Sequence, residues 1–462
     1  MKLIEGQLIH RRYRLDSRLA QGGMGEVWKG YDIQLGREVA IKALRSDVTN
    51  AEAKLRRLRA EAHNSANLAH PNIAALFEYY EHDGIGFLIM TAGGFAAYMD
   101  RIGAAKALVD IAVKPLSMLR APYLVLVGGY FVGQILVMVI PSAAGLAMLL
   151  LVALFPILKA VGTSAAAAAA VIGTSAGVTF APTAGTANLA AQVGSLDPVI
   201  YLVQYQLPVA VPTLIVIAAA HYFVQRFYDK KNDDVYTDVS AAKAADQPAA
   251  PKWYAVFPIL PIALLIIFSK LVVASIKLDT VSALFMVWIG VVIIEIIRSR
   301  DVKKVFKDGL AMFQSMGKMF AGIVALIICA EFFATGLKVS GLIDILINSA
   351  QGVGAGMGAM TVILTSIVSI VTFLTGSGVG AYSSFATLAP DVAAGLGGSV
   401  AELVTPMQFA SGLLRAMSPV AGVIIAVAGA AGVSPMAIVR RTWIPMILGI
   451  ITAIIANEIF IG

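Results

Sequence analysis

The segment MQFASGLLRAMSPVAGVIIAVAGAAG, residues 407–432, is the stretch of sequence on which the fold depends. It is long enough to cross a membrane as a helix, yet Arg415 and the pair Ser418-Pro419 interrupt its middle. A charge at bilayer depth costs about 3 kcal/mol or more, so we expect Arg415 to face a polar cavity or a partner. Proline breaks the helix, and in lipid such breaks are tolerated mainly where they line a cavity. The segment therefore predicts a broken membrane helix beside a binding site.

The composition of the chain predicts a protein with several membrane spans. Of its 462 residues, 58% are hydrophobic and only 14% are charged, and the net charge is +7. We interpret the excess of Lys and Arg as cytoplasmic loops, so we do not expect nucleic acid as a partner. The single cysteine, Cys329, excludes a disulfide within the chain, and residues 1–20 lack the apolar core of a signal peptide.

The first 90 residues differ from the rest, because charges are dense there and no apolar run reaches membrane length. Alternating apolar residues flank a glycine-rich turn at Gly22 and Gly25, which predicts a β-hairpin. The strand Val39-Ala40-Ile41-Lys42 follows, and Glu61, on a later polar helix, is placed to pair with the lysine. Together these features resemble the N-terminal lobe of bacterial Ser/Thr protein kinases.

The resemblance to the kinase lobe covers about residues 7–90. No H-R-D, D-F-G or A-P-E tripeptide occurs downstream, whereas phosphoryl transfer needs the catalytic and metal-binding aspartates of those motifs. We therefore expect no enzyme activity, no cofactor and no metal. We interpret Gly22, Gly25, Lys42 and Glu61 as remnants of a nucleotide site.

After residue 90 the chain is a series of apolar runs interrupted by glycine, serine and proline. We divide it into a first half at 91–228, a linker at 229–252 and a second half at 253–462. The expected fold class is an all-α polytopic membrane protein with inverted repeats, re-entrant hairpins and broken helices, preceded by a small β-rich kinase-like fragment. Spans are expected at about 255–275 and 319–337, with a basic loop at 298–307.

The interruptions recur in the same order in the two halves, at offsets that agree within about three residues. Paired breaks in corresponding positions of two halves point to the binding site of a transporter. The three pairs are Ser142 with Ser377, Phe155-Pro156 with Ala389-Pro390, and Pro182-Thr183-Ala184-Gly185 with Pro419-Val420-Ala421-Gly422.

Charge predicts which loops face the cytoplasm, because cytoplasmic loops collect Lys and Arg. If both broken arm pairs are hairpins, the basic segments 101–120, 225–252 and 298–307 fall on one face together with Arg440-Arg441. The first hairpin then opens to the cytoplasm and the second to the outside. The connection between the kinase-like lobe and the basic segment 101–120 departs from this pattern. Both are expected in the cytoplasm, yet only about 16 apolar residues, Gly84 to Met99, lie between them. They are too few to cross and return, so either they do not span or the lobe is exported.

Each break begins a new helix near the middle of the membrane, and a helix N-terminus carries roughly half a positive charge. Four such ends would sum to about two charges, which suits a dianion, and Arg415 could add a bidentate clamp. Alternatively, Ser142 and Ser377 only cap helices, and Arg415 pairs with a carbonyl group. The candidate substrate site comprises Ser142, Gly145, Pro182, Thr183, Thr375, Gly376, Ser377, Gly378, Ser411, Arg415, Ser418 and Pro419.

Four further polar residues are weighed separately. Glu331 lies in an apolar run and could carry a coupling proton. Asp391 and Glu402 are expected near the outer surface, and His221 is expected at the membrane interface.

Several motifs resemble the DcuC family of anaerobic C4-dicarboxylate transporters over essentially residues 91–462. The resemblance implies exchange of fumarate, malate and succinate, or succinate efflux, across an inner membrane. Two positions depart from the family pattern: Ser411-Gly412-Leu413-Leu414-Arg415 lacks an asparagine, and Val379 replaces another. The motifs are Gly94-Phe95-Ala96-Ala97-Tyr98-Met99, Ser142-Ala143-Ala144-Gly145-Leu146, Ala181-Pro182-Thr183-Ala184-Gly185, Ala220-His221-Tyr222-Phe223, Thr375-Gly376-Ser377-Gly378 and Ser418-Pro419-Val420-Ala421-Gly422.

The expected partners are a small dicarboxylate, a coupling proton or cation, the lipid bilayer and a second copy of the chain. Three alternatives remain open at this point. The chain transports amino acids or peptides, as related families do. It is a non-functional fusion that lacks the family's first spans. Or it is a membrane sensor linked to the kinase-like lobe.

Overall fold

The computed structural model divides the chain into two compact units, Met1–His82 and Asp83–Gly462. In the first unit the structure describes only the backbone of the strands. In the second it describes residues 84–140, 142–231, 250–269, 272–273, 278–320 and 356–462, with side chains from residue 90 onward. The predictions for Glu61, Cys329 and Glu331 lie outside the described residues.

The first unit contains a four-stranded antiparallel sheet in the order β1-β2-β3-β4. Gly22 pairs with Gly25 across the β2–β3 hairpin, and Lys42 in β4 pairs with Val27 in β3. The glycine-rich segment thus lies at the end of a hairpin, and the V-A-I-K segment forms the next strand. The strands are β1 (Leu8–Ile9), β2 (Tyr13–Gly22), β3 (Gly25–Asp32) and β4 (Arg37–Leu44).

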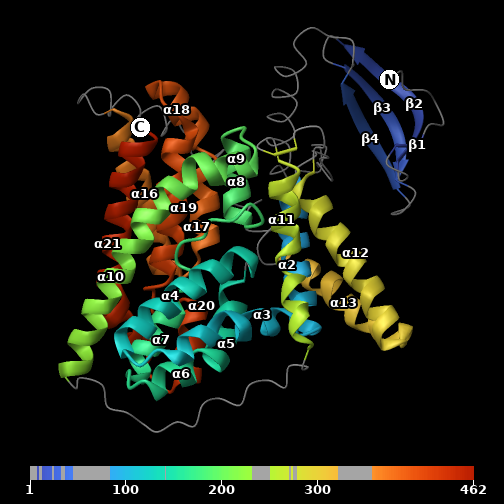
Figure 1. Cartoon of the computed structure of the whole chain (residues 1–462). Coiled ribbons are helices and arrows are strands. Elements are labelled where there is room, and N and C mark those ends of the chain that lie inside the picture. Colours follow the sequence, from blue (N-terminus) through green and yellow to red (C-terminus); the bar gives the residue numbers. More distant parts are fainter. Residues whose placement is uncertain are drawn as a thin grey trace. The chain divides into compact units, whose positions relative to one another are not determined.

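The described part of the second unit is helical (Figure 1). Its first half begins with α2 (Gly84–Arg101), α3 (Ala104–Val113) and the short η1 (Lys114–Met118). It continues with α4 (Pro122–Val139), α5 (Ala143–Ala153), α6 (Phe155–Ala160), α7 (Ala165–Thr174), α8 (Gly185–Val193), α9 (Pro198–Ile200), the π-helix η2 (Tyr201–Gln206) and α10 (Leu207–Lys231).

After residue 250 the chain forms η3 (Lys252–Val256), α11 (Leu260–Ile267), α12 (Thr280–Ser299) and α13 (Val302–Met319). Its last part comprises α16 (Met357–Thr375), α17 (Gly378–Ala386), α18 (Ala389–Leu396), α19 (Val400–Arg415), α20 (Gly422–Ala431) and α21 (Pro435–Phe460).

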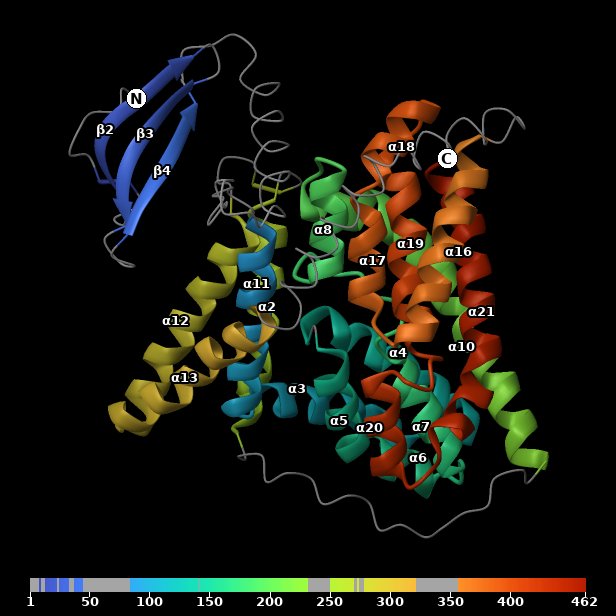
Figure 2. The ribbon, with the colours of Figure 1, turned by 180° about the vertical axis from the view of Figure 1, so that it is seen from behind.

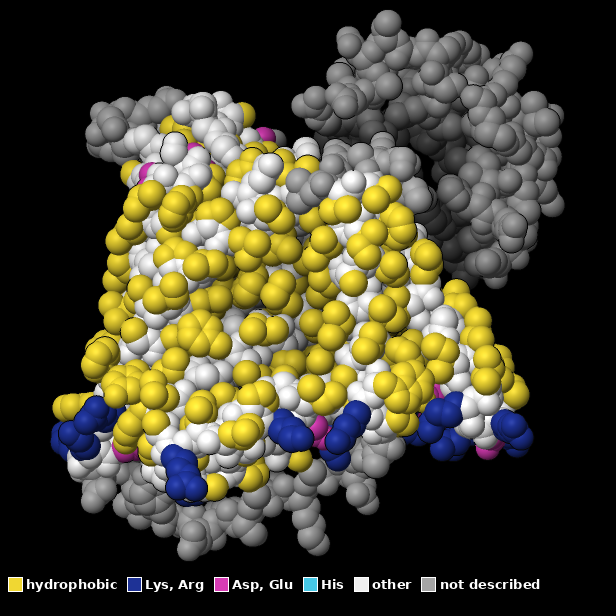
Figure 3. Space-filling model, in the orientation of Figure 1, with side chains coloured by type: hydrophobic (Ala, Val, Ile, Leu, Met, Phe, Trp, Pro, Cys, Tyr) yellow, Lys and Arg dark blue, Asp and Glu magenta, His cyan; other side chains and the backbone are white. Residues whose placement is uncertain are grey.

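Among the described residues, five helices are long and apolar enough to cross a membrane: Pro122–Val139, Pro198–Lys231, Thr280–Ser299, Met357–Thr375 and Pro435–Phe460. The helices beside the interruptions are shorter, and α7 is almost entirely buried because alanines let its neighbours approach closely. In Figure 3 an apolar belt covers the visible face, with Lys and Arg side chains along its lower edge. This distribution is that of a multi-pass membrane protein.

Two helical hairpins open on opposite sides of the unit. The first joins α4 to α5 and α6, and the second joins α16 to α17 and α18. In Figures 1 and 2, α6 lies at the lower end of the unit and α18 at the upper end. Each hairpin precedes an interrupted helix, α7–α8 or α19–α20, and then a long helix, α10 or α21.

Three details differ from the expected layout. Residue 90 lies inside α2, which is one continuous helix of 18 residues and about 27 Å, long enough for one crossing only. The basic segment at 298–307 is not a loop after Arg300, because Asp301 caps α13 and three lysines lie on its exposed first turns. Within the span expected at 255–275, the described residues form a short helix, α11, preceded by η3.

Helix α2 packs closely against α13 through the glycine pair at its centre. A Cβ on Gly94 would lie 2.7 Å from Met316 Cγ and 2.8 Å from the carbonyl oxygen of Met312. The hydroxyl of Ser315 donates a hydrogen bond to the carbonyl of Gly93 at 3.1 Å. The glycines of the G-G-F-A segment therefore allow two backbones to approach.

We expect Gly94→Ala to destabilise the unit by about 1–3 kcal/mol, because the added methyl group meets a backbone oxygen that cannot move away. Thermal unfolding in detergent measures this effect. Gly290→Ala on α12 is the matched control, since nothing lies within 4 Å of its new Cβ. Equal melting temperatures for the two variants would contradict the close packing of α2 and α13.

Candidate substrate site

The two interrupted helices cross at their breaks. The first break is residues 175–184, between α7 and α8, and the second is residues 416–421, between α19 and α20. A Cβ on Gly412 would overlap the carbonyl oxygen of Gly177, so the backbones touch one turn before the second break. Glycine at position 412 is thus required for the crossing.

Arg415 lies at this crossing and is incompletely satisfied. Its Nη2 donates a hydrogen bond to the carbonyl oxygen of Ala176 at 2.9 Å, whereas its Nε is buried without a partner. Within the described residues it forms no ion pair. The sequence analysis gave pairing with a carbonyl group as the alternative to substrate binding, and the structure shows such a contact. The contact leaves the positive charge and the Nε donor without a partner, which is costly away from water.

Each break is held to the first arm of its own hairpin by an equivalent hydrogen bond. The hydroxyl of Thr183 donates to the carbonyl of Met138 at 3.3 Å, and that of Ser418 donates to the carbonyl of Phe373 at 2.7 Å. Both acceptors lie in the last turn of a hairpin arm, where helix carbonyls lack partners within the helix. The recurring breaks in the sequence therefore correspond to recurring contacts.

The hairpin tips are capped in the same way. Ser142 Oγ accepts from the amide of Gly145 at 3.2 Å, and Ser377 Oγ accepts from the amide of Gly380 at 3.3 Å. Both serines therefore have the capping role that the sequence left as an alternative.

The second tip meets the second break. Gly376 has a φ of 71°, and a Cβ there would lie 2.9 Å from the amide nitrogen of Ala421. A Cβ on Gly378 would overlap the carbonyl oxygen of Ser411. Side chains at either glycine would push the tip away from the crossing.

The remaining predicted residues are more dispersed. Thr375 is exposed, and its hydroxyl donates to Val371 in its own helix. The hydroxyl of Ser411 is likewise used within its helix, and the carbonyl of Pro182 accepts from the Asn188 side chain. The structure thus brings together Gly376, Gly378, Ser411, Arg415 and Ser418, with Pro419 partly exposed beside them. Ser142 and Gly145 lie at the other hairpin tip, and Thr183 binds its arm.

The sequence reading missed Gln408, which joins the two broken helices. Its Nε2 donates to the carbonyl of Thr179 at 2.9 Å, inside the first break. Its Oε1 accepts from Tyr201 Oη at 3.1 Å and from Gln206 Nε2 at 2.8 Å, both in the π-helix η2. A glutamine within an apolar run was the available signal, and π-helices often mark functional sites.

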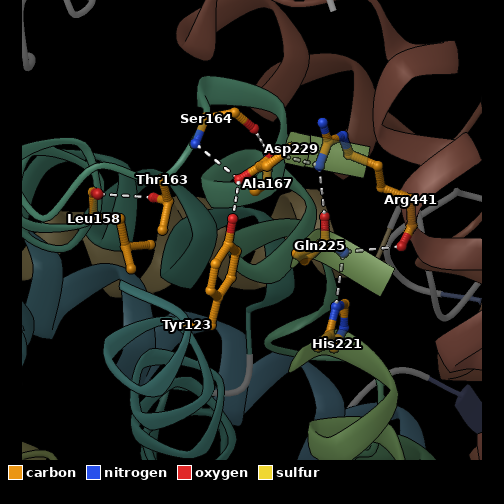
Figure 4. A network of polar contacts seen from close by, with 9 residues as sticks. All are labelled: Tyr123, Leu158, Thr163, Ser164, Ala167, His221, Gln225, Asp229 and Arg441. Atoms are coloured by element: carbon orange, nitrogen blue, oxygen red, sulfur yellow. Dashed lines mark hydrogen bonds and ion pairs between the residues drawn. The ribbon is translucent and has the colours of Figure 1, made fainter. Parts of the chain in front are cut away.

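His221, which the sequence places at the membrane interface, has a side chain that is completely buried among helices (Figure 4). Its Nε2 lies 3.0 Å from Thr174 Oγ1, and its Nδ1 lies 3.2 Å from Gln225 Nε2. Thr174 is the last residue of α7, and its carbonyl accepts from Gln134 of α4. His221 therefore supports the helix end from which the first break departs.

The same network ends in a buried ion pair between the two long helices. Arg441 of α21 donates from Nη1 to Asp229 Oδ1 of α10 at 2.8 Å, and only 1% and 10% of the two side chains are exposed. Asp229 Oδ2 also accepts from Tyr123 Oη and from the amide of Ser164 at the start of α7. One carboxylate thus joins the ends of α4, α7, α10 and α21.

The fold and the crossing of broken helices are those of a multi-pass membrane protein, and two transporters of known structure share this fold. The YdaH transporter of Alcanivorax borkumensis aligns with a TM-score of 0.56 at 14% identity, covering 93% of this chain and 92% of that one. MtrF of Neisseria gonorrhoeae aligns with a TM-score of 0.50 at 12% identity, covering 91% and 87%. At these identities the likeness concerns the fold alone.

The chain belongs to the DcuC family, the C4-dicarboxylate anaerobic carriers, whose family model matches residues 49–461. It is 37% identical over 379 residues to the probable anaerobic C4-dicarboxylate transporter DcuC of Vibrio cholerae, covering 82% of each chain. It is 35% identical over 377 residues to DcuC of Escherichia coli K12, covering 82% of this chain and 81% of the relative. These relatives are transporters and not enzymes, as the sequence predicted.

A shorter match concerns a kinase. The Ser/Thr protein kinase PknA of Mycobacterium tuberculosis is 40% identical over 94 residues, which are 20% of each chain. This match confirms the resemblance of the N-terminal fragment, and it leaves four-fifths of the kinase without a counterpart.

We expect Gly412→Ala to lower the melting temperature and to abolish transport, because the methyl group separates the two breaks at a cost of about 1–3 kcal/mol. Gly429→Ala on α20 is the control, since its new Cβ meets nothing within 4 Å. Unfolding and uptake are measured on both variants. Normal uptake by Gly412→Ala would show that the close crossing is dispensable.

We expect Arg441→Leu to destabilise the protein by about 3 kcal/mol or more, because it leaves the carboxylate of Asp229 buried and unpaired. The double variant Arg441→Leu/Asp229→Asn removes that charge and should recover part of the loss. Chemical denaturation in detergent measures both. If the double variant is no more stable than the single one, the ion pair does not dominate this junction.

Proposed function

We propose that the chain is a secondary transporter that exchanges or exports C4-dicarboxylates such as fumarate, malate and succinate across the bacterial inner membrane. The observation that carries this proposal is the uncompensated guanidinium of Arg415 at the crossing of two interrupted helices. A carboxylate could accept from its free Nε and complete a charge-assisted pair. The family membership supports a dicarboxylate as the substrate.

We interpret the two halves as inverted repeats that work by alternating access. The support is the matched order of elements, the opposite openings of the hairpins and the equivalent bonds of Thr183 and Ser418. The packing is also reciprocal, because α5 of the first hairpin contacts α20 while α17 of the second contacts α8. Such repeats can move against each other around a fixed site.

The orientation follows from charge. Exposed Lys and Arg side chains lie just before α4, near the ends of α6, α10 and α12, and in the first turns of α21. Figure 3 shows Lys and Arg side chains along the lower edge of the unit. With that edge in the cytoplasm, the hairpin of α4–α6 opens inward and that of α16–α18 opens outward.

The positive charge of the candidate site favours dicarboxylates over zwitterionic amino acids. A dianion gains from Arg415 and from the N-termini of α5, α8, α17 and α20, whereas a zwitterionic amino acid would bring an ammonium group to the same positive region. This favours dicarboxylates over the amino acids and peptides moved by related families. The transport function is assigned to residues 83–462, and none is assigned to the kinase-like fragment.

We expect Arg415→Ala to abolish uptake of labelled succinate or fumarate by proteoliposomes, because it removes the incompletely paired cation at the crossing. Arg415→Lys should retain weak uptake, since lysine keeps the charge but loses the bidentate geometry. Both variants should remain in the membrane at normal levels. Arg440→Ala, at an exposed position on α21, is the control.

Uptake by Arg415→Ala equal to that of the unaltered chain would remove the arginine from the substrate site. Competition with unlabelled amino acids tests the substrate class. If they displace the label as well as dicarboxylates do, the site does not select dianions.

A further inference from the structure

Asp100, the penultimate residue of α2, is a carboxylate that the site described above does not use. Its Oδ2 lies 3.8 Å from the position that a Cβ on Gly145 would occupy, at the tip of the first hairpin. Its Oδ1 is buried and has no hydrogen-bond partner among the described residues. A buried carboxylate oxygen without a partner is costly, so an acid kept at this position points to a function.

The neighbouring residue, Arg101, does form an ion pair. Arg101 pairs through Nε with Asp308 Oδ1 of α13 at 2.8 Å. Asp100, one residue earlier, has no ion pair within the described residues and points toward α5 instead. Packing alone therefore does not explain an acid at this position.

Among the acidic groups on this and the surrounding elements, Asp100 is the exception. Helix α2 packs against α3, α8, α12 and α13, and α8 carries no charge. The described charges of the other three are Lys106 and Asp110 on α3, Glu295 and Arg298 on α12, and Lys303, Lys304, Lys307, Asp308 and Lys318 on α13. Glu295 is paired with Arg298 and Asp308 with Arg101, while Asp110 is exposed. Helix α5 carries no charge at all.

The residue faces the positive end of α5, whose first turn Ser142 caps. A substrate carboxylate bound at that end would lie beside the carboxylate of Asp100. Two ionised carboxylates at one helix end repel each other, and a proton on one of them removes the repulsion.

We propose that Asp100 carries the coupling proton of transport. It is ionised when the first hairpin tip is empty and protonated when a substrate carboxylate occupies that tip. Its carboxylate takes the proton from water on the side to which the site is open, and returns it to water when the substrate leaves. The proposal rests on the proposed transport of dicarboxylates by this site.

The experiment uses the full chain in proteoliposomes loaded with a pH-sensitive dye, and follows labelled succinate together with internal pH. We expect net uptake to acidify the lumen and to weaken as the external pH rises, because ionised Asp100 then opposes the substrate carboxylate. Asp100→Asn should keep counterflow exchange, lose the acidification to background and show a flat pH profile. Asp100→Glu should retain coupling, and Asp110→Asn, at an exposed site on α3, should match the unaltered chain.

Acidification in proportion to uptake by Asp100→Asn would overturn the proposal, and so would a folded Asp100→Asn protein that no longer exchanges. If that variant does not fold, the test is the internal pH of proteoliposomes with the unaltered chain. Dicarboxylate uptake without proton movement there also overturns the role of Asp100. Failure of the proposed function is distinguishable, since the unaltered chain would then take up no dicarboxylate at any pH.

Discussion

The contact between Arg415 and the carbonyl of Ala176 is the interaction on which the site depends, because it places an incompletely paired cation where two broken helices cross. Interrupting a helix in a membrane frees backbone groups that water cannot satisfy. Here side chains satisfy them: Thr183 and Ser418 take up the last carbonyls of the hairpin arms, and Ser142 and Ser377 take up the first amides. At the crossing itself, Nε of Arg415 stays without a partner among the described residues, and a cation with a free donor is suited to an anion.

The two halves are alike in their backbone contacts and differ in their polar side chains. Thr183 and Ser418 bind equivalent carbonyls, whereas Arg415 and Gln408 both belong to the second half and reach across to the first break. The first half contributes His221 and Asp229 to the supporting network, and Arg441 of the second half pairs with Asp229 at its end. The side chains that reach across the crossing therefore come from the second half, while the long helices α10 and α21 are joined by a buried ion pair that is costly to disrupt.

Much of this arrangement could be predicted from local signals. Capping by Ser142 and Ser377 was foreseen as the alternative to a substrate role, because serine before a new helix has a direct physical role, and the structure shows both caps. Gln408 and His221 were missed or misplaced, because a single polar residue in an apolar helix does not reveal its partner. His221 lies four residues before Gln225 on the same helix. Their other partners are Thr174 of α7 for His221 and the carbonyl of Arg441 of α21 for Gln225, both far away in the chain. Asp100 was overlooked for the same reason, since its proximity to Gly145 arises only when α2 packs beside the first hairpin.

The sequence by itself determined the membrane character, the positions of the breaks and the kinase-like start, because hydropathy, proline, serine and glycine act on the segment that contains them. It also indicated the paired halves, since a recurring order of interruptions needs no structure to be seen. Only the tertiary structure decided which breaks touch. Glycines 376, 378 and 412 became informative once another backbone was found where their side chains would be. Close approach between distant segments depends on all the helices packing together, and no local pattern in the chain records it.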